Sequence, residues 1–242
     1  MEETKRLDSL PGCNYRIWQD SKEFAFTTDA VFLAAFPHLV TKARALELGC
    51  GTGAISLLLA ARGAEQVLGV DNNSQVTELF AESITVNHLE NKITPLNCDL
   101  RLLPEKYPPE QFDLIIANPP YRIGGKRRRV ATKACHEVDT TLEDFFQVAA
   151  YMVKYRGRFA LVQLPERFSE AVLLGKKYDL ELKRLQWVHS FVEKKAWIFL
   201  GEFAKGGSSG LEVLPPLIMY NRDGSYSKDT LKYYGMQEKQ EV

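Results

Sequence analysis

The sequence predicts an α/β fold, in which a mostly parallel β-sheet is covered by helices on both faces. The first observation is that short apolar runs alternate with helix-like stretches between residues 44 and 118, as expected where helical crossovers join parallel strands. The second is that glycines, acids or an amide follow these apolar runs. Ligands bind at the carboxyl ends of the strands in such sheets, so we expect the chemistry at that edge.

Length and composition favour one domain. The chain has 242 residues, of which 45% are hydrophobic, which is enough for a single large core. We expect one domain over residues 1–242, with residues 1–40 as an N-terminal extension that packs on the core and residues 235–242 as a frayed tail. The formal net charge is zero, so a nucleic-acid site would have to be a local patch.

The cysteines and the N-terminus indicate the cellular environment. Four scattered cysteines form no CxxC pair, so we predict reduced thiols and no metal site. The first residues are polar, and no apolar run approaches the ~20 residues of a membrane span. We therefore expect a cytoplasmic protein without a membrane partner, and we favour a monomer.

The first half of the chain contains the clearest strand and helix signals. Residues 24–30 predict the start of a helix, with Thr28 or Asp29 as its cap. Asn73 or Ser74 is a plausible cap for a later helix. The expected strands cover residues 44–50, 66–71, 92–99 and 112–118, and the expected helices cover residues 53–62 and 73–88.

The second half continues the alternation. Thr140 or Thr141, followed by acids, predicts a capped helix start, and Pro165 suits the first turn of another helix. The expected helices cover residues 140–155 and 165–178, and the expected strands cover residues 157–164, 183–188, 197–203 and, less regularly, 211–220.

A glycine-rich turn follows the first predicted parallel strand. Glycines at 49, 51 and 53 allow a sharp turn and the close approach of a ligand, and the next helix offers its N-terminus to a negative group. Gly49, Gly51 and Ala54 satisfy the G-x-G-x-x-A pattern of dinucleotide sites. The turn alone leaves a nicotinamide cofactor and S-adenosylmethionine open, while Glu47 and Gly53 favour S-adenosylmethionine.

Acids end the next two strands. A carboxylate at Asp71 can accept the two hydroxyls of an adenosine ribose. Asp99 can accept a hydrogen bond from the amino group of an adenine. These two acids are therefore candidate cofactor contacts.

The motif NPPY, at residues 118–121, follows the strand at 112–118 and separates the possible functions best. The amino nitrogen of an adenine or an amide is a poor nucleophile, and a site that uses it must hold its N–H bonds with acceptors. The side-chain oxygen of Asn118 and the backbone carbonyl of Pro119 are suitable, and the prolines preorganise them. Tyr121 offers a flat face to a base.

A basic segment comes directly after this motif. Its cations could neutralise phosphates around an RNA target, although a charge run is more often a solvated surface. The candidate RNA contacts are Arg122, Lys126, Arg127, Arg128, Arg129 and Lys133. We expect His136 and Glu137 to hold the loop after NPPY, without a catalytic role.

The ordered motifs ELGCGTG, VD, CD and NPPY resemble those of class I S-adenosylmethionine-dependent methyltransferases that act on amino nitrogens. Four further segments, over about residues 7–230 in all, resemble the bacterial valine-tRNA adenine-N6 methyltransferase family. They are RIWQDSKEFAFTTDAVFLAAF, ACHEVDTTLEDF, PER and LEVLPPLIMYNRDGSYS. The resemblance implies a Rossmann-like fold with a mostly parallel seven-stranded sheet, and methyl transfer to adenine-37, beside the anticodon of valine tRNA.

The resemblance also implies residue roles. The segment around Thr28 and Asp29 would close over the methionine end of the cofactor. The implied catalytic residues are Asn118, Pro119, Pro120 and Tyr121. The implied S-adenosylmethionine contacts are Thr28, Asp29, Glu47, Gly49, Gly51, Asp71, Asn72, Asp99, Leu100 and Asn118.

Three other functions remain open at this point. A glutamine N5-methyltransferase that acts on a release factor shares NPPY, but such enzymes carry a longer helical N-terminal domain. A nicotinamide oxidoreductase shares the glycine pattern. An RNA-binding protein that retains the fold without catalysis is the third alternative, and the intact NPPY motif disfavours it.

Overall fold

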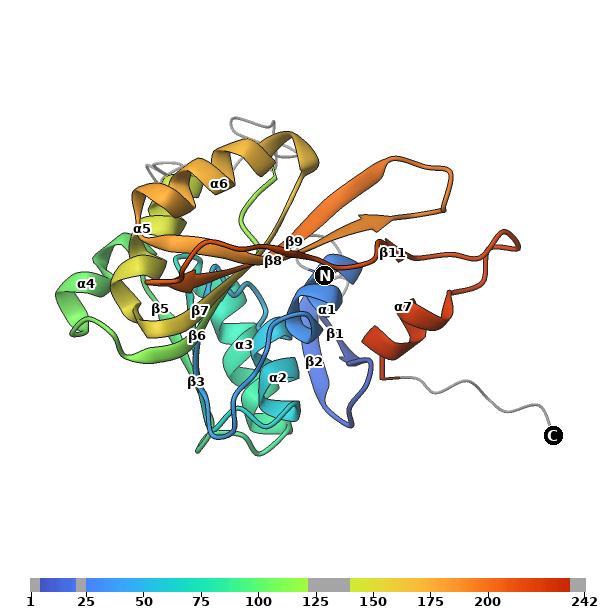
Figure 1. Cartoon of the computed structure of the whole chain (residues 1–242). Helices are drawn as coiled ribbons and strands as arrows, with labels where there is room; N and C mark the ends of the chain where they lie inside the picture. Colours follow the sequence, from blue (N-terminus) through green and yellow to red (C-terminus); the bar gives the residue numbers. More distant parts are fainter. Residues whose placement is uncertain (1–4, 21–24, 122–139, 236–242) are drawn as a thin grey trace, which may run out of the picture.

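The computed structural model describes residues 5–20, 25–121 and 140–235. Within this part of the chain, one large sheet runs in the order β10-β8-β9-β7-β6-β3-β4-β5, and β11 also pairs with β8 (Figure 1). Its strands are β3 (Arg44–Leu48), β4 (Gln66–Asp71), β5 (Ile93–Asn97), β6 (Phe112–Ala117), β7 (Val153–Gln163), β8 (Leu180–His189), β9 (Ala196–Lys205), β10 (Glu212–Val213) and β11 (Leu217–Ile218).

The pairing confirms the predicted mostly parallel sheet. β9 is antiparallel to both β7 and β8, and the other pairs in this sheet are parallel. The seven long strands match the expected seven-stranded sheet, and β10 and β11 add two short strands beside β8. The fold is therefore the predicted Rossmann-like α/β architecture.

Helices cover both faces of the sheet, as expected. On one face, Phe32 and Leu57 pack with Leu114 of β6. On the other, Phe146 packs with Ile115 of the same strand, because successive strand residues point to opposite faces. The helices are α1 (Thr28–Ala35), α2 (Ala54–Ala61), α3 (Ser74–Val86), α4 (Leu103–Lys106), α5 (Leu142–Met152), α6 (Phe168–Lys177) and α7 (Lys228–Tyr233).

The N-terminal residues form an antiparallel hairpin, which the sequence did not predict. Its strands are β1 (Lys5–Ser9) and β2 (Arg16–Asp20). The backbone N–H of Trp18 donates to Ser83 Oγ at 2.8 Å, and that of Arg16 donates to Asn87 Oδ1 at 2.8 Å. The hairpin is thus held on α3 and the residues that follow it.

Two predicted elements end or break at positions that the sequence did not indicate. The helix expected over residues 140–155 ends at Met152, since Val153 is buried and pairs with Phe112 of β6. The strand expected over residues 211–220 is broken into β10 and β11 on either side of Pro215 and Pro216, which have no N–H for a strand ladder.

The caps of three helices can be compared with the prediction. The N-cap of α1 is Thr27, so the expected caps Thr28 and Asp29 are wrong by one or two positions, because the Asp29 side chain makes contacts elsewhere. Asn73 caps α3 through its side chain, as expected. Thr141 caps α5 in a capping box with Asp144, which confirms the second of the two expected residues.

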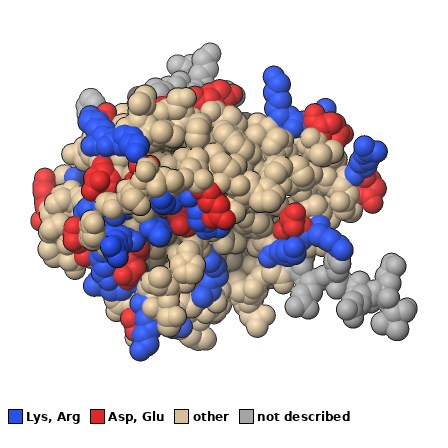
Figure 2. All heavy atoms as spheres, in the orientation of Figure 1, with Lys and Arg blue, Asp and Glu red and all other residues tan. Residues whose placement is uncertain are grey.

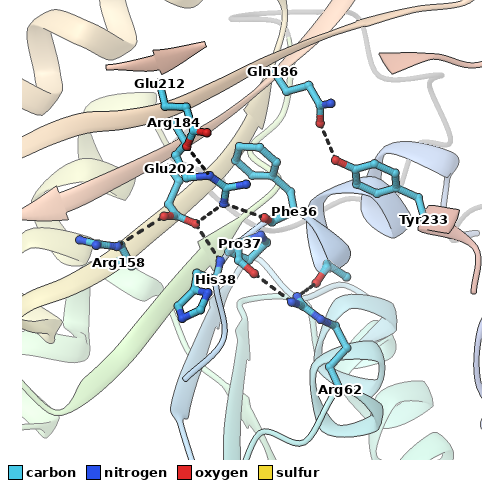
Figure 3. A network of polar contacts seen from close by, with 11 residues as sticks. Phe36, Pro37, His38, Arg62, Arg158, Arg184, Gln186, Glu202, Glu212 and Tyr233 are labelled. Atoms are coloured by element: carbon cyan, nitrogen blue, oxygen red, sulfur yellow. Dashed lines mark hydrogen bonds and ion pairs between the residues drawn. The ribbon is translucent and has the colours of Figure 1, made fainter. Parts of the chain in front are cut away.

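A buried ion-pair network fixes the segment after α1 (Figure 3). Glu202, which is 1% exposed, accepts from the backbone N–H of His38 at 2.9 Å and pairs with Arg158 and Arg184 at 3.4 and 3.3 Å. Arg62, at the end of α2, donates to the carbonyl of Pro37 at 2.9 Å. Strands β7–β9 and helix α2 therefore hold α1 in place from its C-terminal side.

The strand order contains one topological switch point. From β3 the chain moves outward to β4 and β5, and it then returns to β6 on the other side of β3. The loops that leave β3 and β6 therefore diverge and leave a crevice at the carboxyl edge of the sheet, where ligands bind in this class of fold. In the described part of the chain, no helix is long and apolar enough to cross a membrane.

Candidate active site at the carboxyl edge of the sheet

The glycine turn after β3 forms one wall of the crevice. Gly49, Gly51 and Gly53 have φ values of +72°, +51° and +85°, a region that strongly favours glycine. A Cβ on Gly53 would lie 1.9 Å from the ring of Phe80, whereas a Cβ on Gly51 would meet no atom within 4 Å. Gly53 is therefore needed for packing, and Gly51 leaves space that a ligand can enter.

Asp71, at the end of β4, holds this turn. Its Oδ2 accepts from the backbone N–H of Gly51 at 2.9 Å, and its Oδ1 accepts from that of Asn73 at 2.9 Å. Each carboxylate oxygen keeps a second lone pair, so these contacts leave acceptor capacity for a ribose hydroxyl. The proposed ribose contact of Asp71 stays a prediction.

Glu47, near the carboxyl end of β3, is buried next to the glycine turn. It accepts hydrogen bonds from the backbone N–H of Ser56, at 2.8 Å, and from its hydroxyl. Burial raises the pKa of Glu47 to about 8, although the Ser56 hydrogen bonds act in the opposite direction. Glu47 lines the crevice and also fixes the first turns of α2.

NPPY, at the carboxyl end of β6, forms the opposite wall, and Asp29 of α1 joins two of its residues. Asn118 Nδ2 donates to Asp29 Oδ2 at 3.4 Å, and the hydroxyl of Tyr121 donates to the same oxygen. Asp29 is 4% exposed. Burial and the Asp29 carboxylate raise the pKa of Tyr121, so its phenol stays neutral. The carboxylate predicted to face the cofactor thus contacts NPPY.

Gln163, which the sequence analysis missed, supports the motif from the other side. It is fully buried at the end of β7, and its Nε2 lies 3.5 Å from the carbonyl oxygen of Pro120, while its Oε1 accepts from the N–H of Leu164. A polar residue at the end of the apolar run FALVQ was the available signal. NPPY is therefore contacted by α1 through Asp29 and by β7 through Gln163.

A cavity of about 230 Å³ lies between the two walls. Its position matches the topological switch point between β3 and β6. The residues that line it are Ala25, Phe26, Thr27, Ala30, Glu47, Gly49, Cys50, Gly51, Thr52, Ala54, Ile55 and Asn118. The structure thus brings Glu47, the glycine turn and Asn118 around one space.

Four other predicted contacts are not among the residues that line this cavity. Both carboxylate oxygens of Asp99 contact Arg101, and these hydrogen bonds lower the pKa of Asp99. Asn72 is exposed and Leu100 is buried. Thr28 Oγ1 accepts from the hydroxyl of Tyr234 at 3.3 Å. The cofactor roles of these residues stay predictions.

The predicted basic segment cannot be compared with the structure. Arg122, Lys126, Arg127, Arg128, Arg129, Lys133, His136 and Glu137 lie outside the described residues.

Several curated relatives carry the same name, tRNA1(Val) (adenine(37)-N6)-methyltransferase. The protein of Bacteroides fragilis strain YCH46 is 27% identical over 153 residues, which are 61% of this chain and 63% of that protein. The protein of Parabacteroides distasonis is 28% identical over 175 residues, which are 70% of this chain and 72% of that protein. The match with the Bacteroides protein thus spans less than two thirds of its length.

Solved structures share the fold. A predicted O-methyltransferase from Agrobacterium tumefaciens superposes with a TM-score of 0.68 at 20% identity and covers 86% of this chain and 97% of its own. The tRNA m1G37 methyltransferase of M. jannaschii superposes with a TM-score of 0.63 at 18% identity and covers 86% of this chain and 56% of its own.

The glycine turn, NPPY and every residue that lines the cavity except Ala25 lie within residues 26–176, which match the model of the methyltransferase small domain family, and the chain belongs to this family.

Proposed function

We propose that this protein transfers a methyl group from S-adenosylmethionine to the N6 amino group of an adenine in tRNA, at adenine 37 of valine tRNA. The observation that carries the proposal is the orientation of the Asn118 amide at the cavity. Its Nδ2 faces Asp29, so its Oδ1 is the atom left to accept an N–H bond from a substrate amine.

The cavity residues fit S-adenosylmethionine. Gly51 has open space where a side chain would otherwise project, and the same cavity is lined by Asn118, so a bound donor and the amine acceptor would be neighbours. When bound, the cofactor supplies an activated methyl group on a sulfonium. Family membership also argues against the nicotinamide alternative.

The amine needs orientation more than activation by a base. Its lone pair is delocalised into the purine ring, and acceptors on its N–H bonds turn that lone pair toward the methyl donor. Asn118 Oδ1 and the carbonyl of Pro119 are the two candidates, and they are preorganised by Asp29 and by the Gln163 contact with Pro120. The methylated nitrogen is acidic enough to release its proton without a dedicated base.

The choice of tRNA as substrate is supported by the relatives. The curated proteins that match 61–73% of this chain are named for adenine-37 of a valine tRNA. An anticodon-loop adenine is unpaired, so moving it into a cavity costs little. A cytoplasmic location and a monomeric state stay predictions beside this proposal.

The test is methyl transfer by the purified protein from labelled S-adenosylmethionine to unmodified valine tRNA, followed by mass spectrometry of the nucleosides. We expect N6-methyladenosine at position 37 of the tRNA. A transcript that carries guanosine at position 37 should contain no N6-methyladenosine. Methylation of a release-factor glutamine in place of tRNA would establish the main alternative. Cofactor binding without turnover on the tRNA would support a non-catalytic RNA-binding protein.

A further inference from the structure

Four aromatic rings form a continuous row in the C-terminal part of the chain. Tyr220 and Tyr226 stack with ring centroids 5.4 Å apart and an interplanar angle of 16°, and Tyr226 and Tyr234 stack at 5.4 Å and 27°. Phe191 continues the row beyond Tyr220 at 5.5 Å. We call Phe191, Tyr220, Tyr226 and Tyr234 the aromatic row.

The aromatic row lies at the catalytic edge of the sheet. β8 is parallel to β7 because both are antiparallel to β9, so the β8–β9 connection, which contains Phe191, follows a carboxyl strand end. Tyr220 comes directly after β11 (Leu217–Ile218) and residue Met219. At the inner end of the row, the Tyr234 hydroxyl donates to Thr28, the residue before Asp29.

The aromatic row and the predicted cofactor acids lie on opposite halves of this edge. Asp71 and Asp99 follow β4 and β5, on one side of the switch point. β8 and β11 are on the other side, beyond β6 and β7 (Figure 1). NPPY lies between the two halves, so a substrate that reaches Asn118 from the side away from the acids would pass the row.

The aromatic row is accessible and has cations beside it. Tyr226 is 39% exposed, and Phe191 and Tyr220 are half-buried. Lys194, Lys195 and Arg222 are exposed and make no ion pair with the described residues. These cations can contact phosphates. Tyr226 is stacked between Tyr220 and Tyr234, so the ring face left to a base is the outer face of Phe191, which has Tyr220 as its one ring neighbour among the described residues.

The surface charge favours stacking over bulk electrostatics as the source of affinity. Acidic and basic side chains are interspersed over the face that Figure 2 shows, with a wide uncharged area between them. The whole chain has a formal net charge of zero. A nucleic acid would therefore gain little from the overall field and more from local contacts.

We propose that the outer face of Phe191, at the end of the aromatic row, is a stacking surface for an unpaired base of the RNA substrate, which would continue the row. The proposal rests on the RNA methyltransferase function above and adds a contact surface to it. Bases of a single-stranded loop stack on aromatic side chains regardless of their sequence, so the surface would select for unpaired RNA and leave base identity to the cavity.

The test compares Phe191→Leu with Phe191→Tyr and with the matched control Tyr155→Leu. Leucine keeps an apolar side chain but removes the π-face, and tyrosine keeps it. Tyr155 is an exposed aromatic residue, 60% exposed, but it lies near the start of β7 at the opposite edge. The probes are the unmodified anticodon stem-loop of valine tRNA and a fully paired RNA hairpin with the same number of phosphates.

We expect Phe191→Leu to weaken binding of the stem-loop about 5- to 150-fold, the range for losing one stacked base, and to leave hairpin binding unchanged. Because stacking releases no counterions, the salt dependence should keep its slope. The KM for tRNA should rise, while kcat and S-adenosylmethionine affinity stay the same. Phe191→Tyr and Tyr155→Leu should both behave as wild type.

Two failures are distinguishable. If the wild type methylates tRNA and Phe191→Leu binds the stem-loop as tightly as Tyr155→Leu does, the stacking surface is wrong and the proposed function stands. If the wild type neither binds nor methylates the tRNA, both proposals are wrong. Circular dichroism and thermal unfolding of each variant show whether a loss of binding reflects a loss of folding.

Discussion

Asn118 is the residue on which the proposed chemistry depends most directly. We expect Asn118→Ala to lower single-turnover methyl transfer about 100- to 1000-fold, because a preorganised acceptor that strengthens in the transition state is lost. Affinity for S-adenosylmethionine and tRNA should change little. Turnover within a few-fold of wild type, at saturating ligands, would mean that NPPY is only a structural turn.

Asp29 is expected to act through Asn118, since its carboxylate fixes which end of the amide faces the cavity. We expect Asp29→Asn to lower kcat about 10- to 100-fold, as when a supporting hydrogen bond behind an active-site ligand is removed, with little change in KM. In an Asn118→Ala background the same change should have no further effect.

The control for Asp29 is Asp113→Asn. Asp113 is a part-buried carboxylate that, like Asp29, accepts hydrogen bonds: it pairs with Lys154 at 2.6 Å and accepts from the Arg44 N–H at 2.9 Å, but it lies near the start of β6. The Asp113→Asn variant should leave kcat unchanged. Additive losses in the Asp29 and Asn118 double variant would show that the two residues act independently.

Glu47 predicts a pH-dependent stability. Its pKa is about 8 in the folded protein and 4.5 as the reference value for the unfolded chain, so the folded state holds the proton more tightly. The free energy of unfolding should therefore fall as pH rises from about 4.5 to about 8, by up to about 1.4 kcal/mol per pH unit.

The variant Glu47→Gln carries no titrating proton and should remove this slope from the pH dependence. Urea unfolding of both proteins across the same pH range measures it. Parallel stability curves for wild type and variant would show that Glu47 is ionised in the folded protein at neutral pH.

At the scale of elements, the position of α1 depends on the ion-pair network of Glu202, Arg158 and Arg184, which we call the clamp. Removing a buried carboxylate that accepts from His38 and pairs with two arginines should cost about 1.5–3 kcal/mol. This loss of stability is smaller than the loss on breaking a fully buried ion pair, because Arg158 and Arg184 are 37% and 28% exposed and can rehydrate. Denaturant unfolding of Glu202→Ala measures the loss.

Glu212→Ala is the matched control for the clamp. Glu212 also pairs with Arg184, at 3.5 Å, but is 63% exposed, so its removal should cost less than about 1 kcal/mol. Since the clamp holds the segment after α1, Glu202→Ala should also lower kcat through Asp29. Equal losses of stability in the two variants would contradict the assigned role.

At the scale of the whole molecule, the cavity couples cofactor binding to global stability. A ligand at 100 times its Kd stabilises the native state by about 2.7 kcal/mol, which for a chain of this size raises Tm by roughly 5–11 °C. We expect S-adenosylmethionine to produce such a shift in thermal unfolding, and a nicotinamide dinucleotide to produce none.

Two glycines separate a loss of the cavity from a general loss of stability. Gly51 and Gly63 both have positive φ and open space where a Cβ would lie, but only Gly51 lines the cavity. We expect Gly51→Ala to lose the Tm shift caused by S-adenosylmethionine and Gly63→Ala to keep it. A full shift in Gly51→Ala would place the cofactor elsewhere.

Much of the fold follows from local sequence. The strand and helix pattern over residues 44–118 predicted β3–β6, α2 and α3, because apolar periodicity and glycine turns act over a few residues. The N-terminal hairpin and the division of residues 211–220 were missed. The hairpin is held by contacts with Ser83 and Asn87, which are distant in the chain. In residues 211–220, two adjacent prolines override the apolar pattern.

The sequence by itself determined the α/β class, the glycine turn and the motif NPPY, since each depends on the conformational freedom or chemistry of neighbouring residues. Only the tertiary structure decided that Asp29 orients Asn118, 89 residues away, and that Gln163 supports Pro120. Only the tertiary structure placed the aromatic row on the edge that holds the cavity. The physical reason is that strand order and helix packing set these contacts, and local spacing does not encode either.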